Sequence, residues 1–61
     1  MLVVMSVGAT EAEVQDVRRH IEADGLTPHE SRGEQRVIIG VVGDVGPRKE
    51  QVMAHLAVLP G

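Results

Sequence analysis

The chain has 61 residues and a formal net charge of −3 with histidine counted as neutral, and it contains no cysteine and no Phe, Tyr or Trp. A chain of this length forms one domain at most, and its core has to be built from aliphatic and methionine side chains. The acidic balance argues against a nucleic-acid partner, because phosphate binding needs a basic surface. Without cysteine there is neither a disulfide framework nor a thiolate metal site.

The sequence begins with a short apolar run, M-L-V-V-M. This run is too short for a signal peptide and has no basic leader before it. No stretch approaches the roughly 20 apolar residues that cross a bilayer. We therefore expect a soluble, cytoplasmic protein with no membrane partner.

The first half of the chain predicts a strand at residues 2–6 and a helix at residues 10–24. Thr10 and Glu13 have the spacing of a capping box, in which each side chain bonds the backbone of the other residue. An apolar stripe follows at helical spacing, formed by Val14, Val17 and Ile21. Gly25 is expected to end the helix, with Leu26 folding back onto it.

Residues 27–44 predict a β-hairpin around which the domain is organised. Its first strand, residues 27–31, contains Pro28, which lacks an N–H and favours an edge position. The turn is centred on Gly33, whose backbone freedom suits it. The second strand, residues 36–42, is apolar on both faces and should need cover on both sides. One small domain rarely supplies both covers, so a partner is implied.

A second helix is expected over residues 47–58, with an apolar stripe formed by Val52, Met53, Leu56 and Leu59. The order strand, helix, strand, strand, helix predicts an α+β, ferredoxin-like (ACT-like) fold. Both helices should lie on one face of an antiparallel sheet with strand order 1-3-2. The last strand of that fold is missing, so the strand at residues 2–6 should be an open edge that invites self-association.

The best candidates for recognising a ligand are His29 and Ser31 on the first hairpin strand. Strand alternation places them on one face, about 6.6 Å apart. Gly40 on the neighbouring strand marks a bulge, a close helix contact, or a place where a ligand or a second backbone approaches. The functional interpretation competes with a plain one, in which both polar residues only solvate an edge strand.

Other chemistry is not supported by the sequence. The remaining histidines, His20 and His55, are far from His29 along the chain, so a zinc or copper site is not expected. A copper carrier of this topology would use a C-x-x-C loop, and an RNA binder would stack bases on aromatic residues. The glycine-rich stretch 40–46 lacks the lysine of a phosphate loop. We expect no catalytic residue and no cofactor in this chain.

Three stretches together resemble a known family: M-L-V-V-M followed by Gly8-Ala9-Thr10, then His29-x-Ser31-x-Gly33, then V-I-I-G-V-V-G-D over residues 37–44. They are similar to the N-terminal regulatory domain of 3-deoxy-D-arabino-heptulosonate 7-phosphate (DAHP) synthase, the subtype with a small ferredoxin-like extension before a (β/α)8 barrel. The similarity runs over nearly the whole chain, which would then be an excised domain or a fragment.

The resemblance implies a parent transferase that condenses phosphoenolpyruvate with erythrose 4-phosphate, using a divalent metal, at the start of aromatic amino-acid synthesis. The catalytic and metal-binding residues would belong to the barrel. The extension would bind tyrosine or phenylalanine between two copies from different subunits, with His29 and Ser31 contacting the amino acid. That pair would cover barrel entrances and produce feedback inhibition. The alternative is an ACT-like dimerisation module without a ligand.

Overall fold

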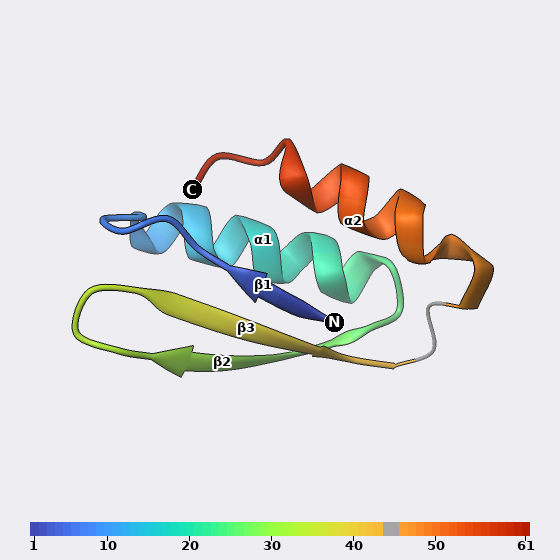
Figure 1. Cartoon of the computed structure of the whole chain (residues 1–61), viewed down its shortest axis with the longest axis horizontal. Coiled ribbons are helices and arrows are strands. Elements are labelled where there is room, and N and C mark those ends of the chain that lie inside the picture. Colours follow the sequence, from blue (N-terminus) through green and yellow to red (C-terminus); the bar gives the residue numbers. More distant parts are fainter. Residues whose placement is uncertain (44–45) are drawn as a thin grey trace.

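Three strands form one antiparallel sheet in the order β1-β3-β2, and the two helices lie together on one side of it (Figure 1). The computed structural model describes residues 1–43 and 46–61. The elements follow in chain order as β1 (Leu2–Val4), α1 (Glu11–Ala23), β2 (Thr27–Arg32), β3 (Val37–Val42), a 3-10 turn (Gly46–Arg48) and α2 (Lys49–Ala57). The predicted ferredoxin-like arrangement, with β3 in the middle and the Pro28 strand at an edge, is confirmed.

Strand alternation decides which side chains of β3 face the helices. Ile39 and Val41 are buried, whereas Ile38 and Val42 point to the other side and are 37% and 56% exposed. The described residues of the domain thus supply one of the two covers that the sequence calls for, on the side of Ile39 and Val41. Two helices can cover only one side of this sheet, so the second apolar face of β3 is left in solvent.

Local sequence fixes both ends of α1. The Thr10 hydroxyl accepts from the Glu13 N–H at 3.1 Å and the Glu13 carboxylate accepts from the Thr10 N–H at 2.8 Å, which completes the predicted capping box. At the other end Gly25 has a φ of 77°, and the Leu26 N–H donates to the Ile21 carbonyl at 3.1 Å. This is a Schellman stop, and Leu26 packs back into the core as expected.

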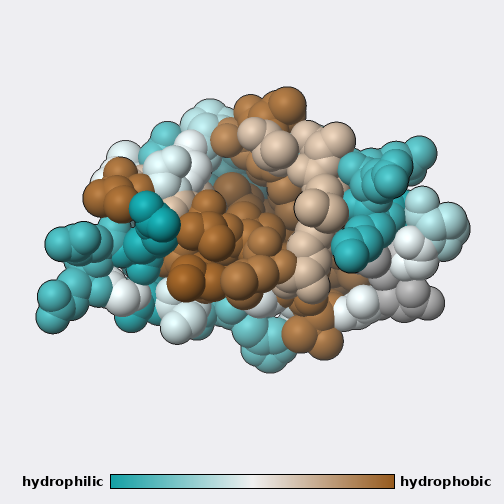
Figure 2. All heavy atoms as spheres, in the orientation of Figure 1, coloured by the Kyte–Doolittle hydropathy of each residue, from teal (hydrophilic) through white to brown (hydrophobic). Residues whose placement is uncertain are grey.

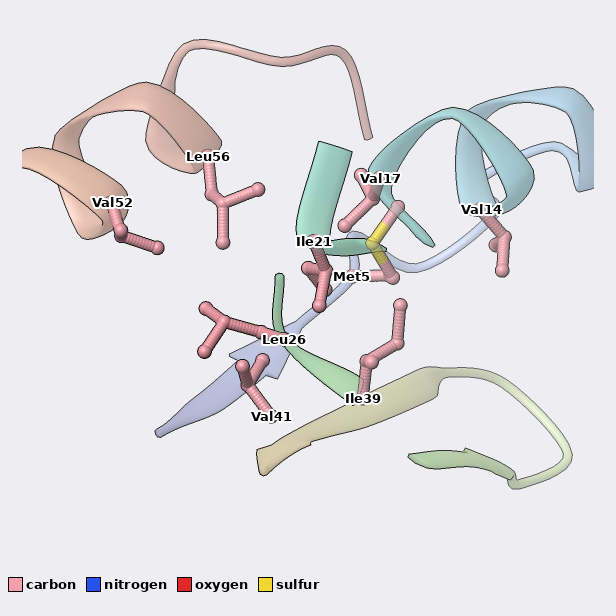
Figure 3. Packing of buried hydrophobic residues seen from close by; sticks show 9 residues of the cluster. All are labelled: Met5, Val14, Val17, Ile21, Leu26, Ile39, Val41, Val52 and Leu56. Atoms are coloured by element: carbon pink, nitrogen blue, oxygen red, sulfur yellow. The ribbon is translucent and has the colours of Figure 1, made fainter. Parts of the chain in front are cut away.

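The core is a single layer of aliphatic and methionine side chains between the sheet and the helices (Figure 3). Its members come from α1, β3 and α2 and from the segments after β1 and α1: Met5, Val14, Val17, Ile21, Leu26, Ile39, Val41, Val52 and Leu56. The stripe of α1 is buried as predicted. Met53 was expected in the stripe of α2 but is 48% exposed, because only Val52 and Leu56 of that helix face the sheet.

Several element boundaries differ from those expected by one or two residues. The first strand ends at Val4, two residues before the expected end, and beyond it the Met5 N–H still donates to the Val37 carbonyl while the Ser6 N–H donates to the Gly61 carbonyl. The second helix starts as a 3-10 turn, since Arg48 gives no side-chain cap and the tighter turn satisfies the first N–H groups. The hairpin loop spans residues 33–36 and is closed by the Gly33 N–H and the Arg36 carbonyl at 2.9 Å. Gly33 is not in the left-handed region, so the turn does not use the freedom predicted for it.

Neighbouring residues of β3 provide a matched test of this one-sided core. Ile39→Val should lower the free energy of unfolding by about 0.5–1.5 kcal/mol, since the side chain is fully buried. Ile38→Val removes the same methyl group from the exposed face and should change the free energy by less than about 0.5 kcal/mol. Urea denaturation measures both. Equal losses would show that the two faces of β3 are equally buried in solution.

Among the described residues β1 pairs with β3 alone, so its other edge is open. The Met1 carbonyl and the Met5 N–H, on either side of β1, bond to Val41 and Val37 beside it, so alternation turns the backbone groups of Leu2 and Val4 towards the open edge. Both side chains are also exposed, at 64% and 51%. An apolar edge of this kind offers a template for another strand.

We therefore expect the 61-residue chain to self-associate through β1. Light scattering should show oligomers that grow with concentration, and the Leu2 and Val4 amides should exchange more slowly as they form. Val4→Lys should reduce the association, because an edge lysine blocks strand pairing. Val58→Lys, at another exposed apolar position, is the control and should leave it unchanged. A monomer at high concentration with fast exchange along β1 would contradict this.

Candidate functional site

The sheet surface turned away from the helices is the candidate site, and we call it the open face. It is formed by alternate residues of the three strands: Leu2, Val4, Thr27, His29, Ser31, Ile38, Gly40 and Val42. Four of these are large aliphatic residues that are between 37% and 64% exposed. The open face therefore combines an apolar patch with a polar margin supplied by β2.

Strand register arranges the open face in rows that run across the strands. His29 lies opposite Gly40, and Gly40 lies opposite Leu2. In the next row Ser31 lies opposite Ile38, which in turn lies opposite Val4. Directly opposite side chains have their Cβ atoms about 4.5–5.5 Å apart. His29 and Ser31 are thus brought together on one face, as predicted, each at the end of a row that continues into apolar side chains.

Gly40 makes a gap in the middle of its row. The register on both sides is continuous, so the strand has no bulge there, and Gly40 faces away from the helices. The two structural explanations offered by the sequence, a bulge and a close helix contact, are therefore both wrong. A Cβ atom at this position would lie 3.7 Å from the His29 carbonyl oxygen, an ordinary contact. The strand could hold alanine, and the glycine instead leaves a recess between His29 and Leu2.

A hollow of about 360 Å³ lies between β1 and α2, and neither His29 nor Ser31 lines it. Its walls include Val4 of the strand and Met53, Leu56 and Leu59 of the C-terminal segment. Figure 2 shows apolar surface running from β1 towards the end of α2 with this hollow between them.

Ion pairs on the opposite side of β2 fix this strand against α1. Arg32 bridges the Glu11 carboxylate at 2.8 Å and the Glu30 carboxylate, and Arg18 lies 3.4 Å from Glu30. Glu30 is the least exposed of these groups, with 15% of its side chain accessible. The residues that alternate with His29 and Ser31 therefore anchor the strand that carries them.

The same contacts shift two titrating groups. Hydrogen bonds from Gln15 and Arg32 lower the pKa of Glu11 below its ordinary value of 4.5, and hydrogen bonds to Glu30 and Glu11 raise the pKa of Arg32. A lowered carboxylate pKa means that the ionised form is stabilised in the folded state. This stabilisation is complete above the ordinary pKa and is lost as the pH falls through the lowered value.

Arg32→Ala should therefore move the pKa of Glu11 up towards 4.5, as should Gln15→Ala. Carboxyl NMR titration measures the change directly. Arg19→Ala is the matched control, because this guanidinium pairs with Asp16 at 3.3 Å and does not contact Glu11. A Glu11 pKa that is insensitive to Arg32 would mean that β2 is not anchored through this pair in solution.

Within residues 1–43 and 46–61, no three His, Asp or Glu side chains are grouped so that they could hold a metal ion. Neither described helix is long and apolar enough to cross a membrane. The histidines are not all isolated, however, because the rings of His20 and His55 have centroids 5.0 Å apart. The sequence could not indicate that contact, since it joins two different helices.

Comparison with known proteins places this architecture in a family. The family model of the DAHP synthase ferredoxin-like domain matches residues 1–61. The chain belongs to the DAHP synthase ferredoxin-like domain family. It is 39% identical over 44 residues to the phospho-2-dehydro-3-deoxyheptonate aldolase of Thermotoga maritima. A crystal structure of the Thermotoga maritima enzyme, DAHP synthase, matches with a TM-score of 0.71 and 30% sequence identity over 87% of this chain.

The DAHP synthase ferredoxin-like domain is a small part of these relatives. The matched region is 72% of this chain but 13% of the curated relative, and the structural match covers 16% of the crystallised chain. The resemblance found in the sequence is thereby confirmed, and so is its fold. Sequence reasoning missed that Leu2 and Val4 belong to the same face as His29. The sequence does show that β1 is apolar on both faces. Only the strand register shows that Leu2 and Val4 lie in the same rows as His29 and Ser31.

Proposed function

We propose that this domain is a feedback-regulatory module of DAHP synthase that binds tyrosine or phenylalanine on its open face, between two copies. The observation that carries the proposal is the pair of rows in which His29 and Ser31 each adjoin apolar side chains. An aromatic amino acid needs both kinds of contact, because it has an apolar ring and polar groups that must be hydrogen-bonded when buried.

The second copy in this proposal is supported by the shape and composition of the open face. The open face has four exposed aliphatic side chains, and covering them with another apolar surface would be favourable because it removes them from water. Two copies related by a twofold axis would bring the same patch together from both sides. The ring of the ligand would then lie over the recess at Gly40, with Ile38 and Val42 beside it.

Control of catalysis in this proposal is indirect. The described residues form no metal cluster, so the divalent metal and the condensation chemistry of the parent enzyme would belong to its barrel. Closing two open faces on a ligand would fix the relative positions of the subunits that carry them. The pair would then cover the entrances of barrel active sites, which gives feedback inhibition as a population shift towards the closed arrangement.

Ser31→Ala should affect the binding of tyrosine and of phenylalanine differently. If the Ser31 hydroxyl bonds the tyrosine hydroxyl, the change should weaken tyrosine by about 0.5–1.5 kcal/mol and phenylalanine much less. Calorimetry and inhibition of the enzyme that carries this domain measure both. Thr27→Val is the matched control, because it removes a hydroxyl from the same strand face at the row of Val42. Equal losses for both ligands would place Ser31 against the shared amino-acid backbone.

An ACT-like dimerisation module without a ligand is the second candidate, favoured by the four exposed aliphatic side chains of the open face. Millimolar tyrosine or phenylalanine should shift the His29 resonances in an NMR titration if the regulatory proposal is correct. Gly40→Ala should fold normally but weaken that response by filling the recess. Dimerisation with no shift at any ligand concentration, and with His29→Ala and Ser31→Ala both silent, would favour the second candidate.

A further inference from the structure

We draw no further inference here: the strongest candidate, the apolar hollow between β1 and α2 that Leu2, Val4 and Met53 line beside the open edge of β1, carries nothing beyond the self-association already expected of that edge, because nothing in the structure shows what covers it.

Discussion

β3 is apolar on both faces, and the two helices cover only one of them. A strand of this composition is stabilised when other elements pack against both of its faces, because each contact removes apolar surface from water. The chain satisfies this requirement on the side of Ile39 and Val41, where the whole core gathers. On the side of Ile38 and Val42 the requirement is unmet within the domain. The open face, and the second copy proposed to cover it, both follow from that imbalance.

β2 shows how one edge strand serves two surfaces. Glu30 and Arg32 point towards α1 and tie the strand to it through Arg18 and Glu11. The alternate residues, His29 and Ser31, are then held at fixed positions beside the central strand. Exposed ion pairs add little to stability individually, but a network across two elements limits how the strand can move. A polar strand next to an apolar one is therefore a suitable margin for a ligand with a ring and polar groups.

The size of the domain is consistent with a role that depends on other surfaces. A domain of about 60 residues buries only about 60% of the surface that its unfolded chain exposes, so its own core leaves little stability in reserve. The family relatives are much longer than this chain, which matches 13% of one and 16% of another. Uncovered features such as the open face and the edge of β1 are where a larger assembly would add stability.

Local sequence by itself determined where the helices and strands form and which side chains share a face of each element. Thr10 and Glu13 cap α1 and Gly25 ends it through contacts within a few residues, and alternation puts His29 beside Ser31 in any strand. Only the tertiary structure decided which residues from distant elements became neighbours. Leu2 joined the row of Gly40 through the β1–β3 register, and His55 reached His20 through the packing of two helices. These contacts depend on how whole elements pack against one another, and no short-range pattern in the chain encodes that geometry.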